Sequence, residues 1–178
     1  MVVPVEVSAT LADIAPAKKH QGMIMRIIDA GMGTWKQGIL QMPNRIAAYN
    51  FNNMIGDIEG RSVLELFAGS GSFSIEALSR GAASATLVEA NRKMTDLIAK
   101  NLARTGLNKY CQVIHMDVRY AVPLLFGRKC TYDIIFMDPP YEMGYVMQIM
   151  TLLQAHPLFT RDTVTIAEYS CRENDTLS

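Results

Sequence analysis

The sequence predicts an α/β fold: a doubly wound, mostly parallel, Rossmann-like sheet with helices on both faces. Two observations predict it. From residue 62 onward, apolar runs of strand length alternate with amphipathic segments of helix length. Glycines or prolines stand between many of these segments. Because strand, helix and strand connect through a right-handed crossover, this alternation places the strands parallel to one another in one sheet.

The expected strands are short and largely apolar. They cover residues 62–67, 85–89, 112–115, 132–137 and 164–169. The helices between them cover residues 72–80, 93–104, 118–126 and 145–155. Gly81 and Gly106 are expected to end the first two helices, because glycine readily takes the left-handed conformation found there. Pro123 is expected to break the third helix, because proline removes one helical hydrogen bond.

The region before residue 62 is expected to be less regular. Residues 25–28 are expected to form a short strand, and Asn44 to cap a helix over about residues 45–55. We expect residues 1–24 to be a peripheral N-terminal extension. Residues 25–178 are expected to form a single domain, since 178 residues fit one domain and leave little room for a second.

Composition narrows the class of protein. The chain is 49% hydrophobic and 19% charged, and it has no apolar stretch near the ~18 residues of a membrane span. Its N-terminus lacks the basic region of a signal peptide. The three cysteines form no C-x-x-C pair and show no metal-ligand spacing. We therefore expect a cytoplasmic monomer with reduced thiols, no metal site and no membrane contact.

Charge gives weaker guidance. Seventeen basic residues balance seventeen acidic residues. This balance disfavours tight, sequence-independent binding to a bare duplex, which usually needs a basic excess. It leaves RNA binding open, because the distribution of charge matters more than its sum.

Polar residues at the strand ends are the candidates for ligand binding, because ligands bind beyond the carboxyl ends of strands in such sheets. The first strand contains Glu65 and leads into Gly69-Ser70-Gly71. Glycines there let the backbone approach a ligand; the alternative is a tight turn chosen for packing. A dinucleotide fingerprint would have a third glycine or an alanine at position 74. Ser74 stands there instead, which disfavours a nicotinamide cofactor.

Two further acids follow in order. Glu89 ends the second strand, 18 residues after Gly71, where an acid typically accepts hydrogen bonds from ribose hydroxyls. The alternative is a solvated acid at a strand end. Asp117 follows the third strand and could accept from an adenine amino group, cap the next helix, or do both. His115 is expected to be a structural strand residue.

The tetrapeptide Asp138-Pro139-Pro140-Tyr141 directly follows the fourth strand. Neither proline can donate a ladder hydrogen bond, so the pair ends the strand in a stiff elbow. The elbow offers a carboxylate, a backbone carbonyl and an aromatic ring. Two acceptors beside a stacking surface suit the exocyclic amine of a nucleobase. The alternative is a proline-rich turn with a surface tyrosine.

The segment VLELFAGSGSFSIEALSRGA and the later FMDPPY closely resemble the RsmD family of bacterial 16S rRNA guanine-N2 methyltransferases. That family shows a near-identical LDLFAGSG and GIEALSRGA, and a DPPY. The likeness covers roughly residues 25–170. It implies a methyltransferase that uses S-adenosyl-L-methionine and acts on 16S rRNA or the 30S subunit.

The resemblance also implies a role for individual residues. It places the cofactor at Glu65, Phe67, Gly69, Gly71, Glu89, Asp117 and Val118. Glu65 stands where the family has an aspartate, near the methionyl amino group. The methyl-acceptor site corresponds to Asp138, Pro139 and Tyr141, and the substrate contacts to Arg45, Pro140 and Tyr141. The chain departs from the family at Gln41-Met42-Pro43, where the family has an R-P-T segment.

The reaction so implied is direct transfer to a guanine amine held by the Asp138 carboxylate and the Pro139 carbonyl, with Tyr141 stacked on the base. Other readings stay open. One is amino methylation of adenine N6 in DNA or of a glutamine amide, although Asp rather than Asn before the prolines disfavours the amide. Another is a relative that binds the cofactor or RNA without turnover. A nicotinamide oxidoreductase is the most distant.

Overall fold

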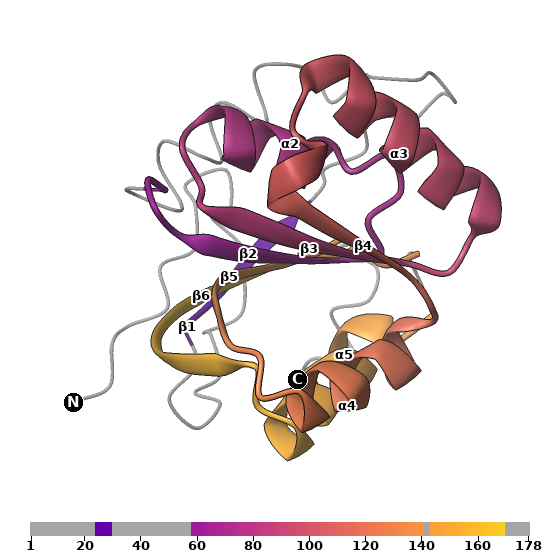
Figure 1. Ribbon diagram of the computed structural model, residues 1–178. Helices are drawn as coiled ribbons and strands as arrows, with labels where there is room; N and C mark the ends of the chain where they lie inside the picture. Colours follow the sequence, from indigo (N-terminus) through magenta and orange to yellow (C-terminus); the bar gives the residue numbers. More distant parts are fainter. Residues whose placement is uncertain (1–23, 30–57, 141–142, 170–178) are drawn as a thin grey trace.

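The computed structural model describes residues 24–29, 58–140 and 143–169, with side chains for 58–140 and 143–167. It confirms the predicted fold class (Figure 1). The strands are β1 (Ile24–Asp29), β2 (Ser62–Leu66), β3 (Ser84–Glu89), β4 (Cys111–His115), β5 (Tyr132–Met137) and β6 (Phe159–Tyr169). The helices are α2 (Ser72–Ser79), α3 (Arg92–Thr105), α4 (Val118–Gly127) and α5 (Tyr145–Ala155), with a 3-10 turn at Asn108–Tyr110.

All six strands run parallel, in the order β1-β6-β5-β2-β3-β4. The chain moves outward from β2 through β3 to β4, and then returns to place β5 on the other side of β2. The order therefore reverses between β2 and β5, which is where doubly wound sheets bind their ligands. The predicted strand at residues 25–28 is confirmed as β1, an edge strand paired with β6.

Helices cover both faces of the sheet: α2 and α3 lie on one face, and α4 and α5 on the other (Figure 1). Each face has its own hydrophobic core, because successive strand residues point to opposite sides. Ile134 packs toward α2 and α3, and Ile135 toward α4 and α5; both are fully buried. Phe73 of α2 stacks on Phe136 of β5 with ring centroids 3.9 Å apart. This packing holds the strands and the helix starts rigidly at the ligand-binding edge.

The prediction that Pro123 breaks the third helix is wrong, since α4 runs unbroken from Val118 to Gly127. Proline lacks the N–H that would bond to the carbonyl four residues earlier, and its ring crowds that carbonyl. That loss is outweighed by burial of the apolar face of α4, which consists of Val118, Ala121, Val122 and Leu125. The last strand also begins earlier than predicted, at Phe159, with a register irregularity against β5.

The predicted helix over about residues 45–55 and its cap Asn44 lie outside the described residues. Within the described part of the chain, no helix has both the length and the apolar character that crossing a membrane requires.

Candidate functional site

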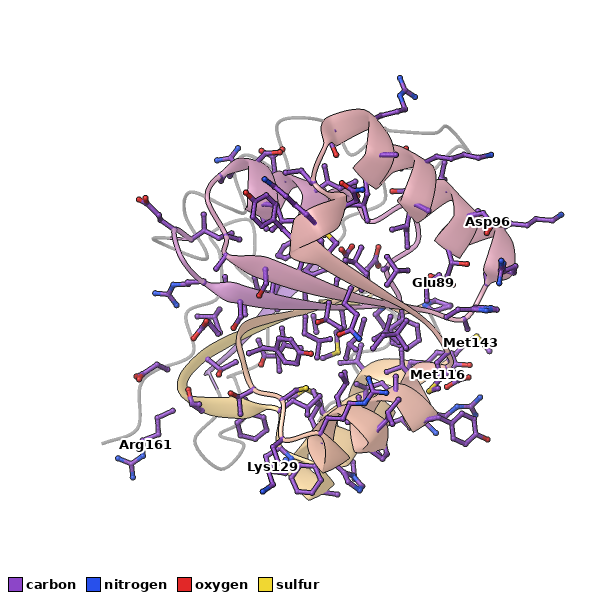
Figure 2. All side chains as sticks on the ribbon, viewed as in Figure 1. Glu89, Asp96, Met116, Lys129, Met143 and Arg161 are labelled. Carbon is purple, nitrogen blue, oxygen red and sulfur yellow. The ribbon has the colours of Figure 1, made fainter. Side chains whose placement is uncertain are left out.

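The carboxyl ends of β2, β3, β4 and β5 meet at one edge of the sheet, and the predicted acids gather there. Figure 2 shows Glu89 at this edge, and the Met116 N–H donates a hydrogen bond to the Glu89 carbonyl at 3.1 Å. Glu65 lies within β2, Glu89 ends β3, Asp117 follows β4 and Asp138 follows β5. The fold thus brings four acids, far apart in the sequence, to one place.

The loop after β2 has a sharply curved backbone. Phe67, Gly69 and Gly71 all have positive φ angles, of 59°, 53° and 74°. A positive φ is rare for phenylalanine and costs on the order of 1–2 kcal/mol, so packing must hold Phe67 in place. Its ring contacts Tyr145, the first residue of α5, at a centroid distance of 5.6 Å.

Glycine stands at the two loop positions for different structural reasons. A Cβ at Gly71 would lie 2.8 Å from Leu87 Cδ2 and 3.3 Å from Ile98 Cγ1 in the core. A Cβ at Gly69 would meet nothing within 4 Å, so its backbone faces open space. Gly71 thus fits the packing alternative, whereas Gly69 leaves the backbone accessible to a ligand.

We expect Gly71→Ala to lower the free energy of unfolding by about 2–4 kcal/mol, because it adds a core clash to a left-handed backbone. Gly69→Ala introduces only the backbone strain and should lower the free energy of unfolding by about 1–2 kcal/mol. Urea denaturation of both variants measures the difference. Equal losses would show that the contact with Leu87 and Ile98 is not what requires glycine at position 71.

Glu89 is held in place rather than freely solvated. Its Oε2 accepts a hydrogen bond from the Gly69 N–H at 2.8 Å, and its Oε1 accepts one from the Asn91 N–H at 2.7 Å. These bonds tie the glycine loop to the end of β3. A carboxylate has about four acceptor positions, so two remain for hydroxyl donors of a ligand.

Glu65 is buried, with only 3% of its surface exposed. Its Oε2 accepts a hydrogen bond from the Ser74 N–H at 2.9 Å, in the first turn of α2. It thereby caps a helix whose own N-cap, Gly71, has no side chain. Burial raises the pKa of Glu65 to about 7; the hydrogen bond from the Ser74 N–H opposes the shift, and the negative charge of Asp138 adds to it.

Asp117 caps α4, as one of its two sequence interpretations predicted. Its Oδ1 accepts from the Arg119 backbone N–H and from Arg119 Nε, both at 2.9 Å. Its Oδ2 accepts from Arg119 Nη2 at 2.6 Å. These hydrogen bonds and the guanidinium charge lower the pKa of Asp117. Three of about four acceptor positions are occupied, which leaves one on Oδ2 for an amino donor.

Asp138 is half-buried directly beyond β5, with Pro139 buried and Pro140 exposed after it. Because Leu66 pairs with Met137, Asp138 leaves the sheet beside Phe67 of the glycine loop, and its negative charge raises the pKa of Glu65. Val118 is buried in the core on the α4 side, which leaves its backbone rather than its side chain for a ligand. Tyr141 and Arg45 lie outside the described residues.

Two residues at this edge were not predicted: Arg119 and Tyr145. Arg119 fixes the Asp117 carboxylate, and Tyr145 packs on Phe67. The sequence signal for Arg119 was its position two residues after an N-cap acid; Tyr145 gave none beyond following the proline elbow.

His115 has the structural role that was expected. Its Nε2 lies 3.0 Å from the Ala90 carbonyl, which connects β4 to the loop after β3. Within the described residues, no group of three or more histidine, cysteine, aspartate or glutamate side chains is arranged to hold a metal ion.

Comparison with known proteins identifies the family. The model of the family described as Conserved hypothetical protein 95 matches residues 37–177. The chain belongs to this family. Among its relatives is YlbH of Bacillus subtilis, 35% identical over 118 residues, which are 66% of this chain and 64% of the relative. Ribosomal RNA small subunit methyltransferase D of Escherichia coli is 32% identical over 117 residues, which are 66% of this chain and 57% of the relative.

Solved structures agree with the fold of this family member. The structure of yhhF from Escherichia coli superposes with a TM-score of 0.59 at 29% identity, over 69% of this chain and 67% of that chain. The chain spans about three fifths of the length of the curated relatives it matches.

Proposed function

We propose that this protein transfers a methyl group from S-adenosyl-L-methionine to the exocyclic N2 amine of a guanine in 16S rRNA. The observation that carries the proposal is the placement of Asp138-Pro139-Pro140 at the switch point, beside the glycine loop and its acids. The name of the Escherichia coli relative, a small-subunit rRNA methyltransferase, supports the same class of reaction. This function would place the protein in the cytoplasm with the 30S subunit or its precursor.

The acids at the edge suit this cofactor chemically. Glu89 has acceptor positions left for the ribose hydroxyls, and Asp117 Oδ2 has one for the adenine amino group. Glu65, under the glycine loop, would lie toward the methionyl amino group. S-adenosyl-L-methionine supplies an electrophilic methyl group on a positively charged sulfur.

Two of these acids disfavour a nicotinamide dinucleotide. The carboxylate of Asp138, and Glu65 in its ionised form, put negative charge beside the loop where a dinucleotide would place its negatively charged pyrophosphate. Like charges repel, whereas a cationic sulfonium and ammonium are attracted. The charge of the site therefore supports the methyl donor over the oxidoreductase alternative.

At the acceptor side, the Asp138 carboxylate and the Pro139 carbonyl would accept the two amine hydrogens of guanine. This arrangement directs the nitrogen lone pair toward the methyl carbon. Asp138 would accept one amine proton and pass it to solvent as the new N–C bond formed and the S–C bond of the methyl donor broke. Tyr141 would stack on the base, which must leave its own stack in a loop or single strand.

The proposal is tested by locating the methyl group. The protein is incubated with radiolabelled S-adenosyl-L-methionine and, separately, unmethylated 30S subunits, naked 16S rRNA, DNA or protein. Label on 16S rRNA supports the proposal. Label on DNA or protein would identify a different amino methyltransferase, and cofactor binding with no transfer would identify the non-catalytic alternative.

We expect Glu89→Ala to weaken the binding of S-adenosyl-L-methionine about 10- to 100-fold. The substitution would remove the two proposed hydrogen bonds from the ribose hydroxyls to the charged carboxylate, and it would loosen the Gly69 backbone. Isothermal titration measures the dissociation constant. The matched control is Glu76→Ala, which removes a carboxylate that pairs with Arg80 on the surface of α2. An unchanged dissociation constant for Glu89→Ala would remove Glu89 from the cofactor site.

A further inference from the structure

One face of α3 carries a line of basic side chains. Lys93, Lys100 and Arg104 are spaced seven and four residues apart, which puts them within an arc of about 40° on the helix. All three are exposed. We call these three residues the α3 basic stripe. It extends over about 16 Å of helix.

Among the described residues, no ion pair neutralises this stripe. The ion pairs found there join Arg92 to Asp96, Arg80 to Glu76 and Arg119 to Asp117. Asp96 is the only acid on α3, against four basic residues, so the helix has a net charge of +3. In a chain of zero net charge, this is a marked local excess.

Helix stability does not explain the position of Lys93. It lies in the first turn of α3, which contains no acidic residue. The helix dipole makes that end positive, so a cation there is disfavoured. Arg104, in the last turn, is favoured by the same dipole. A locally unfavourable cation that forms no ion pair within the described part of the chain is the kind of exception expected at a functional surface.

The stripe begins at the ligand-binding edge. Helix α3 starts at Arg92, three residues after Glu89, and Figure 2 shows Asp96 of its first turns on the same side of the molecule as Glu89. The large hydrophobic side chains exposed in the described part of the chain are Tyr110, Tyr120, Phe126 and Met143, and none is on α3. A charged surface without apolar anchors fits a polyanion rather than a membrane.

We propose that the α3 basic stripe binds phosphates of the RNA substrate. The inference rests on the proposed function and deepens it, since it names a docking surface outside the methyl-transfer site. Separate point charges along a helix match a chain of phosphates, and the contacts carry no sequence information. The stripe also explains how a protein with no net charge holds RNA.

The test replaces Lys93, Lys100 and Arg104 together by glutamine, a good helix former that keeps most of each side chain. Binding of a 16S rRNA fragment is measured by fluorescence anisotropy between 50 and 200 mM salt. Each lost phosphate contact lowers the salt slope by about 0.7–0.9. Over this salt range, wild-type affinity should therefore fall about 20- to 40-fold more than that of the variant. The dissociation constant for S-adenosyl-L-methionine should not change.

The matched control replaces three exposed cations elsewhere: Arg128→Gln, Lys129→Asn and Arg161→Gln. Figure 2 shows Lys129 and Arg161 at the opposite end of the molecule from Glu89. The change in net charge is the same, and the salt slope should stay that of the wild type. An unchanged slope in the stripe variant, or an equal drop in the control, would overturn the inference. Because binding is read without turnover, a protein that binds RNA through the stripe but transfers no methyl group would refute the proposed function alone.

Discussion

Replacing Asp138 by alanine is expected to lower the rate of methyl transfer by at least ~10²-fold while cofactor affinity stays within about 3-fold of the wild type. The physical reason is that Asp138 would orient the guanine amine and receive its proton, while the proposed cofactor contacts come from β2, β3 and β4. Single-turnover transfer to unmethylated 16S rRNA measures the rate, and titration measures the affinity.

Two further variants make this result specific. Asp138→Asn keeps one oxygen acceptor but loses the charge, and should transfer at a rate between those of the wild type and Asp138→Ala. Asp162→Asn removes an exposed acid of β6 and should leave transfer unchanged. A rate for Asp138→Ala within a few-fold of the wild type would show that the elbow after β5 does not hold the acceptor.

The second large effect concerns Glu65 and pH. Because burial raises the pKa of Glu65 from 4.5 to about 7, the native state keeps a proton that the unfolded state releases. The free energy of unfolding should therefore fall as pH rises from about 4.5 to about 7, by about 3 kcal/mol in total, and stay level above that range. Below about pH 4.5 Glu65 is protonated in both the native and the unfolded state, and its stabilising contribution to folding is fully present.

Glu65→Gln should remove that pH dependence. Glutamine keeps a carbonyl acceptor for the Ser74 N–H but has no charge to bury. Urea unfolding between pH 5 and pH 8, without cofactor, should give a nearly flat curve for Glu65→Gln and a falling curve for the wild type. Glu76→Gln, on the surface of α2, should retain the wild-type slope. A slope that persists in Glu65→Gln would place its origin in another group.

The fold followed from local patterns in the sequence. Apolar runs that are separated by helices, such as residues 132–137, predict buried parallel strands. The structure has β5 at those residues. Gly106 ends α3 with a φ of 72°, as its position predicted. The predicted helix break at Pro123 was wrong because it considered only the lost hydrogen bond of the proline. Burial of the apolar face of α4 compensates for that loss.

The placement of the acids was also predictable, since parallel strands end at a common edge. Their chemical state was not. The high pKa of Glu65 arises from burial beneath α2, and the fixed geometry of Asp117 arises from Arg119. The contact between Phe67 and Tyr145 joins residues 78 positions apart in the chain, and only the packing of α5 against the loop after β2 creates it. Such contacts depend on tertiary structure, which no local pattern encodes.

The central claim is tested most directly by the identity of the methylated nucleoside. Unmethylated 30S subunits are incubated with the protein and S-adenosyl-L-methionine, the 16S rRNA is digested to nucleosides, and the product is identified by mass spectrometry. We predict N2-methylguanosine, absent when Asp138→Ala replaces the wild type. Methylation at any other base or position, or N6-methyladenine formed in DNA instead, would contradict the proposal.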